Sequence, residues 1–454
     1  MSSLLLFGLL LQLLAIFLVL KQTGRRWLSY TGVLFVIFAV VFHGLAEIAQ
    51  LIFPEQYNPY RRLVAQSDID SWVVIVSVAI LTFSLTYSII LKRKKGGDSN
   101  KHSRHSVDES QRLNPGTTVN WQIVALATAP GYILAISPNF TTLGYWISGF
   151  IEQFLILGIV LSFLIFLLKH EKMLLPVMLG QTALLALMGN RLSVAAALIM
   201  LLSSATRYGI SVRFKHFWAM VLLIAIISLS ISAVRVDFGR DVFKEDVSER
   251  SAALASSLSS ANNSQNRTSQ VIDDFIYRFD GNAFGGMLYT RLKSLYQPAG
   301  LRPLWNNVLL SVPSFLYPNK LAAEVYMIEE ESFMIYHYTL PIHIDFLPTT
   351  LGIIFGYYGT PFLLIVAIGL GFIFAMIDHW LQKSTTLFSL LIGMALTYCV
   401  IFMEQGLRVY FITFRGTLAL FIILSIIQKA LSIFRQANKS KHSLKNESLV
   451  NTPN

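Results

Sequence analysis

The amino-acid sequence predicts an all-α, polytopic integral membrane protein with about eleven membrane-spanning helices and one large external loop. The chain of 454 residues is 54% hydrophobic and only 13% charged, about half the charged fraction of a soluble globular protein. Its apolar residues form continuous blocks near or above the ~18 residues that a helix needs to cross hydrocarbon. Because these blocks do not alternate between apolar and polar residues, they indicate helices rather than the strands of a barrel.

The apolar blocks fix where each span is expected. The expected spans are residues 3–20, 31–53, 71–91, 119–136, 146–168, 173–189, 192–206, 217–234, 348–377, 386–403 and 409–431. Residues 173–206 would be far too long for a ~30 Å hydrocarbon core if they formed one helix. We therefore expect a tight, outward-facing turn at Gly189, Asn190 and Arg191. No basic segment precedes Leu4–Leu20, so this block is expected to be a retained span rather than a signal peptide.

Lysine and arginine residues alternate between the two sides of these spans. One set of loops, together with the C-terminal end, holds 21 of them, and the short loops of the opposite set hold four. The positive-inside rule places the first set in the cytoplasm. The N-terminus is then outside and the C-terminus inside, which requires an odd number of spans. This distribution also explains the net charge of +11 without any nucleic-acid partner.

The sequence divides into four parts around one long loop. They are 1–234 with eight spans, the periplasmic loop 235–347, 348–433 with three spans, and the cytoplasmic tail 434–454. Long loops cross the membrane regardless of their charge, so the loop's basic residues do not upset the topology. Within the loop, residues 251–270 are rich in Ser, Asn and Ala and are expected to be a weakly ordered linker. The following segment has helical apolar spacing and is expected to be structured.

Ionisable residues inside the membrane are costly and therefore mark candidate functional positions. His43 and Glu47 lie four residues apart and are expected on one helix face, where they pair, share a proton or make a structural contact between helices. Glu404, Arg408 and Arg415 follow steps of four and seven residues, which place them within roughly 40° of one helix face. Arg415 is expected about two turns inside its span.

Arginine also stands next to the turn between two spans and along the external loop. Arg191 suits a fixed phosphate contact, because its guanidinium matches phosphate oxygens and keeps its charge, or else it reaches the lipid headgroups. The charged loop residues considered are Arg235, Arg240, Arg278, Asp280, Arg291, His343 and Asp345. Such charges are ordinary on a solvated loop, but Arg235 and Asp345 are the better candidates because both adjoin a span. Several arginines near one membrane cavity indicate an anionic, lipid-linked substrate, most naturally a diphosphate.

Other classes of chemistry have no support in the sequence. The chain carries no phosphate-binding P-loop, no dinucleotide-binding glycine motif and no metal-ligand cluster. Its single cysteine, Cys399, lies within a span and excludes a disulfide framework in the monomer. We therefore expect neither a cofactor nor a metal.

Three segments of the chain resemble those of Wzy-type polysaccharide polymerases, which join lipid-linked oligosaccharide repeat units. Met188-Gly189-Asn190-Arg191 is similar to the family's Gly-x-Arg element between two spans. The segment 311–320 (SVPSFLYPNK) resembles the family's aromatic and proline motif in the long loop. Residues 345–352, followed by Gly356-Tyr-Tyr-Gly359, resemble the start of the next span. Together with the late periplasmic loop, the resemblance covers nearly the whole chain.

The resemblance implies a metal-independent glycosyltransferase with a membrane fold like that of the GT-C enzymes, in the bacterial inner membrane. It implies transfer of a glycan from undecaprenyl diphosphate to a sugar hydroxyl on another lipid-linked repeat unit. Arginines would neutralise the departing diphosphate. Arg191 matches the family element, and the further substrate-binding candidates are Arg235, Arg278, Arg408, Arg415 and Glu404. The expected partners are the lipid-linked oligosaccharide, the lipid bilayer and a chain-length regulator protein.

The position of the general base favours a polymerase over the related O-antigen ligases. Those ligases place a histidine eleven residues before their Gly-x-x-Gly element, whereas Asp345 stands there in this chain, with His343 two residues earlier. Asp345 and His343 are the catalytic candidates, since either can accept a proton from the acceptor hydroxyl. A ligase, a lipid-linked oligosaccharide flippase or other transporter, and a non-enzymatic scaffold remain as alternatives. The long loop, the absence of two similar halves and the costly Arg415 disfavour the last two.

Overall fold

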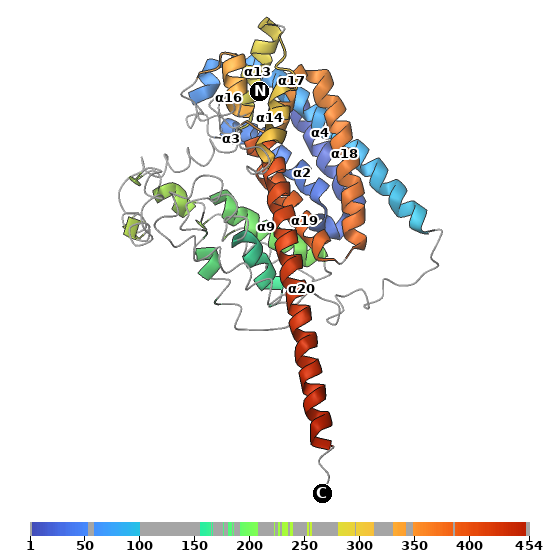
Figure 1. Ribbon diagram of the computed structural model, residues 1–454. Helices are drawn as coiled ribbons and strands as arrows, with labels where there is room; N and C mark the ends of the chain where they lie inside the picture. The colour runs from blue at the N-terminus through green and yellow to red at the C-terminus, as the bar shows by residue number, and fades with distance from the viewer. Residues whose placement is uncertain are drawn as a thin grey trace.

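The computed structural model describes a helical membrane protein (Figure 1). It describes residues 2–52, 59–99, 155–164, 191–207, 280–295, 297–312, 330–341, 348–384 and 386–450, with short stretches between 166 and 256. All elements of regular structure in these residues are helices. Five of these helices are long and apolar enough to cross a membrane. The all-α membrane class is thus confirmed for the described residues, and the total of eleven spans stays a prediction, because several expected spans lie largely outside them.

The helices fall into three groups by length and position. The long apolar helices are α1 (Ser3–Thr23), the continuous α2 (Thr31–Val40), η2 (Val41–Leu45) and α3 (Ala46–Ile52), α4 (Gln66–Ser99), α18 (Thr360–Lys383) and the first part of α20 (Arg408–Val450). Shorter apolar helices are Leu155–Leu164, α9 (Arg191–Arg207) and α19 (Leu387–Ile401). The connecting helices are η1 (Gly24–Ser29), η3 (Pro59–Leu63), α13 (Asn282–Leu295), α14 (Arg302–Ser311), α16 (Glu330–His337), α17 (Thr350–Tyr358) and η9 (Met403–Gln405).

Helix α4 is the centre of the bundle and packs against α1, α18 and α13. Small residues allow the close approach. A Cβ atom on Gly371 would lie 2.7 Å from the Phe83 carbonyl oxygen, and a Cβ atom on Gly285 would lie 2.1 Å from the Trp72 ring. Helices in membranes pack closely through such residues, because lipid offers no hydrophobic drive for their association.

One end of the bundle collects the connections that are rich in lysine and arginine. Lys95 Nζ donates a hydrogen bond to the Gln22 carbonyl oxygen (2.9 Å), which joins the ends of α4 and α1. Arg207 Nη2 and Gln382 Nε2, at the ends of α9 and α18, both donate to the Ser29 carbonyl oxygen, each at 3.1 Å. We call this the basic end of the bundle and the opposite one the loop end. The C-terminal ends of α1, α4, α9 and α18 thus lie at the same end of the bundle.

A buried carboxylate at the basic end caps α2 from another helix. The Asp378 side chain is fully buried and accepts hydrogen bonds from the backbone N–H of Thr31 (2.9 Å) and Gly32 (2.8 Å), and from the Tyr87 hydroxyl (2.8 Å). The first N–H groups of a helix have no partner within the helix, so the carboxylate satisfies donors that would otherwise be buried alone.

We expect Asp378→Ala to lower the free energy of unfolding by about 2–4 kcal/mol, because several donors lose a charged acceptor at once. Thermal melting of the purified protein in detergent measures this loss. Lys383→Gln, at an exposed position of the same helix, is the matched control and is expected to leave the melting temperature within experimental error. Equal melting temperatures for the two variants would contradict the capping role.

The predicted bounds of the span 348–377 are wrong. The chain forms two helices there, because α17 ends at Tyr358 and Gly359 adopts φ +75°, a conformation that favours glycine and stops a helix. Helix α18 begins at Thr360, with Pro361 in its first turn, where the missing N–H costs nothing. The membrane-crossing helix is therefore α18, and α17 belongs to the loop end.

The last helix is longer than expected. Helix α20 continues beyond the part that is apolar enough to cross a membrane, Arg408–Ile426, and ends at Val450, so most of the segment 434–454 is helical. Figure 1 shows α20 running from the loop end past the other helices toward the C-terminus.

Candidate functional site

The loop end combines helices of the long segment between the expected spans, residues 235–347, with the ends of the apolar helices. Figure 1 shows α13, α14, α16 and α17 gathered there, with α20 starting among them. Two buried polar clusters lie at these junctions. One surrounds Arg61 in η3, and the other surrounds Glu330 in α16.

Arg61 holds two carboxylates in the first cluster. The residue is 1% exposed, and its Nε donates to Asp280 Oδ2 at 2.7 Å while its Nη1 donates to Glu47 Oε2 at 3.0 Å. Its Nη2 also donates to both carboxyl groups. Burial alone would lower the pKa of the Arg61 guanidinium, but the Asp280 and Glu47 carboxylates outweigh this effect and raise it. Asp280 is therefore a buried ion-pair partner, and its expected place on a solvated loop is wrong.

Asn282 connects this cluster to the second span. Its Nδ2 donates to the His43 carbonyl oxygen (2.8 Å) and to Glu47 Oε1 (2.7 Å), and its Oδ1 lies 2.8 Å from His43 Nδ1. The chain forms a π-helix over Val41–Leu45, and the Phe42 carbonyl oxygen accepts the backbone N–H of Gly281 at 3.1 Å. Such π turns redirect backbone groups that a regular helix would use. Among the interpretations of His43 and Glu47, the structural contact fits best, because Asn282 bridges them.

The second cluster joins the external helices to the start of α20. Glu330 is 2% exposed, and its Oε2 accepts the backbone N–H groups of Leu407 (2.8 Å) and Arg408 (3.3 Å). The Tyr357 hydroxyl donates to Glu330 Oε1. Asn307 lies beside this carboxyl group and contributes to its electrostatic environment. Burial raises the pKa of Glu330 to about 7, although these donors oppose the shift.

Two arginines share one face of α20. Arg408 is its first residue, and Arg415 follows seven residues, or about 10 Å, further along the axis. Both side chains are partly buried, so two positive charges share one face of the helix within about two turns. The prediction that Glu404 continues this helix face is wrong. Glu404 lies in η9, and Gly406 at φ +70° separates that turn from α20.

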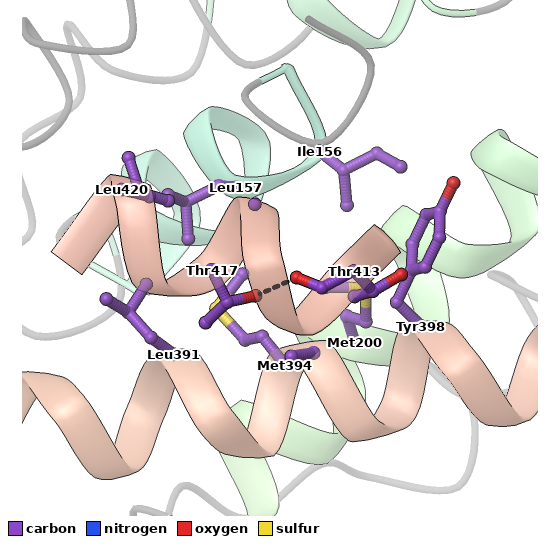
Figure 2. A pocket seen from close by; sticks show the side chains of 11 residues that line it. Ile156, Leu157, Met200, Leu391, Met394, Tyr398, Thr413, Thr417 and Leu420 are labelled. Atoms are coloured by element: carbon purple, nitrogen blue, oxygen red, sulfur yellow. Dashed lines mark hydrogen bonds between the residues drawn. The ribbon is translucent and has the colours of Figure 1, made fainter. Parts of the chain in front are cut away.

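An apolar pocket lies on the other side of the same stretch of α20 (Figure 2). The cavity itself is small, about 40 Å³, and it is partly open to the surroundings. Its lining residues come from helix 155–164, α9, α19 and α20: Ile156, Leu157, Met200, Leu391, Met394, Ala395, Tyr398, Thr413, Gly416, Thr417 and Leu420. The Thr417 hydroxyl donates to the Thr413 carbonyl oxygen at 2.8 Å, so it does not present a free donor to the pocket.

Several candidates from the sequence lie outside the described residues. These are Arg235, Arg240, Arg278, His343 and Asp345, together with the side chain of Arg191. The backbone of Arg191 begins α9, at the opposite end from Arg207. Arg291 is described, and its Nη2 donates to the Thr339 carbonyl oxygen at 3.4 Å on the exposed side of the loop end. No group of metal-ligating side chains occurs within the part of the chain that the structure describes.

Sequence reasoning missed Glu330, Asn282 and the role of Arg61. In the sequence, Arg61 was considered only as one of the basic residues of the short loops. Glu330 belongs to a charged stretch of the external segment, where solvated side chains are the ordinary expectation. Apart from Glu47, which lies 14 residues before Arg61, the partner residues lie far along the chain, so no local spacing reveals them.

Comparison with known proteins adds no further assignment. No protein-family model, curated protein or solved structure matches this chain. The functional interpretation therefore depends on the chain's own residues, and the resemblance to polysaccharide polymerases stays a prediction.

Proposed function

We propose that this protein is a polysaccharide polymerase of the bacterial inner membrane, for O-antigen, capsule or exopolysaccharide. It transfers a glycan from undecaprenyl diphosphate to a lipid-linked repeat unit on the periplasmic side. The observation that carries the proposal is the pair Arg408 and Arg415, two partly buried like charges on one face of a helix that is apolar enough to cross a membrane. An anion between two such charges removes their repulsion, and a diphosphate on a lipid is an anion held at the membrane.

The proposal includes the topology that the charge pattern predicts. The chain has eleven spans in a GT-C-like membrane fold, with the N-terminus in the periplasm and the C-terminus in the cytoplasm. The basic end then faces the cytoplasm under the positive-inside rule. The loop end faces the periplasm, where Arg408 stands at the membrane surface and Arg415 about two turns within it.

The chemistry follows from the charges. The acceptor hydroxyl oxygen attacks the anomeric carbon, and the bond from that carbon to the diphosphate oxygen breaks. The hydroxyl proton passes to Asp345 or His343, and undecaprenyl diphosphate leaves with the bonding electrons. Arginine stabilises the charge that develops on the leaving diphosphate without any proton transfer. We assign this role to Arg408 and Arg415, joined by Arg191, Arg235 and Arg278, with Glu404 at the edge of the site.

A chain-length regulator protein is the proposed partner that limits polymerisation.

Deletion of the gene in its native host, followed by gel analysis of the surface glycan, tests this function. A polymerase predicts a single repeat unit on the lipid core in the deletion strain, with long chains restored by the wild-type gene. Loss of attachment with accumulation of long lipid-linked chains would instead identify a ligase. A normal glycan pattern would exclude both.

A further inference from the structure

We propose that Glu330 is a positioning residue that fixes the first turn of α20 and thereby the arrangement of Arg408 and Arg415. Only one part of this inference rests on the proposed function, namely the consequence for binding an anionic substrate group. The contact itself is a property of the fold. Glu330 does not act on the substrate; it acts through the helix that carries the arginines.

The carboxylate supplies what the start of α20 lacks. The first N–H groups of a helix have no acceptor within the helix. Glu330 Oε2 accepts two of them, from Leu407 and from Arg408 itself, at 2.8 and 3.3 Å. It reaches them from a position 77 residues earlier in the chain. A negative group at this end also interacts favourably with the helix dipole.

The surroundings hold Glu330 in place from several elements. The Tyr357 hydroxyl of α17 donates to its Oε1, and Asn307 of α14 lies beside it. Gly406 allows the close approach, because a Cβ atom there would lie 2.8 Å from Glu330 Oε2. The same glycine adopts φ +70°, which a side chain would strain. Residues of α14, α16 and α17 therefore come together at the Glu330 carboxyl group, which contacts the start of α20.

A fixed first turn matters because the two guanidinium groups repel each other. Fraying or rotation at the start of α20 would let Arg408 move away from Arg415, and the site would lose the charge density that an anion requires. Because a helix is rigid, anchoring Arg408 at its own backbone N–H also fixes the position of Arg415, about two turns further along α20. Since both carboxyl oxygens of Glu330 already accept hydrogen bonds, the side chain is poorly placed to take a proton from a substrate.

Amide hydrogen exchange across residues 403–415 tests the positioning role directly. Glu330→Ala is expected to speed exchange at Leu407 and Arg408 by ~10-fold or more, because both N–H groups lose their acceptor. Glu330→Gln is expected to keep exchange slow, since its amide oxygen can accept these N–H groups and its amide nitrogen can donate to the Tyr357 hydroxyl. Glu331→Ala, at the more exposed neighbouring position, is the matched control and should leave exchange unchanged.

The surface glycan of complemented deletion strains supplies the second readout. We expect Glu330→Ala to shorten the glycan and Glu330→Gln to retain long chains. Unchanged exchange in Glu330→Ala overturns the proposal, and so does raised exchange with glycan of normal length. Loss of long chains in Glu330→Gln with slow exchange also overturns it, because the carboxylate would then act chemically. Arg415→Ala run in parallel separates the two proposals: normal glycan in that strain argues against the polymerase, while raised exchange in Glu330→Ala still supports the anchoring of α20.

Discussion

Arg61→Met is expected to lower the free energy of unfolding by about 3–5 kcal/mol, among the largest effects of any single substitution in this protein. The substitution keeps most of the side-chain volume but removes the only guanidinium between Glu47 and Asp280 in the described structure. Both carboxyl groups are almost fully buried, at 2% and 4% exposure. Each would have to bind a proton or remain charged without its partner, and either outcome destabilises the folded state.

Thermal melting in detergent and proteolysis of the external segment measure the effect. Because Asp280 anchors the start of α13, the loss of Arg61 should expose the external segment to protease before the spanning helices unfold. Arg62→Met, at the exposed neighbouring position, is the control and is expected to change stability by no more than about 0.5 kcal/mol. Equal melting temperatures for the two variants would contradict the structural role of the cluster.

A variant in which all three residues are uncharged separates the contribution of the ion pairs to stability from that of side-chain packing. Arg61→Met combined with Glu47→Gln and Asp280→Asn leaves no buried charge. Replacement of a whole buried ion cluster is often neutral, whereas removal of one partner is not. The triple variant is therefore expected to regain much of the stability that Arg61→Met loses. If it is less stable than Arg61→Met, the network contributes through its geometry as well as its charge balance.

The membrane class was predictable from the sequence, because it depends on local composition. A continuous apolar block must form a helix in lipid, and lysine and arginine mark one side of it. The division of the expected span 348–377 was not predictable in the same way. Mean hydropathy does not report the backbone conformation of Gly359. The residues of α17 are as apolar as those of a span, although this helix packs at the loop end.

The candidate site shows the same limit at the level of single residues. Arg408 and Arg415 were predictable as neighbours because one helix carries both, and helical periodicity relates them. The predicted position of Glu404 on the same helix face was wrong, because Gly406 interrupts that helix with a positive φ. The contact between Arg61 and Asp280 spans 219 residues, and no periodic pattern links residues so far apart. The polar residues that hold the loop end together therefore become visible only in the folded chain.

Arg415→Ala is expected to abolish long-chain glycan in the complemented deletion strain, with a loss of transfer rate on the order of 10²–10³-fold. Arg415 stands deeper along α20 than Arg408, so fewer waters can replace its charge at the leaving diphosphate. Arg408→Ala should have a smaller effect at the membrane surface. Arg415→Lys should restore only part of the activity, because an ammonium group lacks the bidentate geometry of guanidinium.

The control for this prediction is Lys429→Ala, which removes an exposed charge from the same helix and should leave glycan length unchanged. Membrane levels of every variant must be equal by immunoblot. The purified variants then supply the deciding measurement. Arg415 lies partly buried in a helix that is apolar enough to cross a membrane, and a charge within hydrocarbon is costly, so a functional Arg415 is retained at a cost in stability. Arg415→Ala should therefore melt at the same temperature as the wild type or higher while losing activity. If Arg415 had a structural role, Arg415→Ala would lower both the melting temperature and the activity. That result would remove Arg415 from the proposed site.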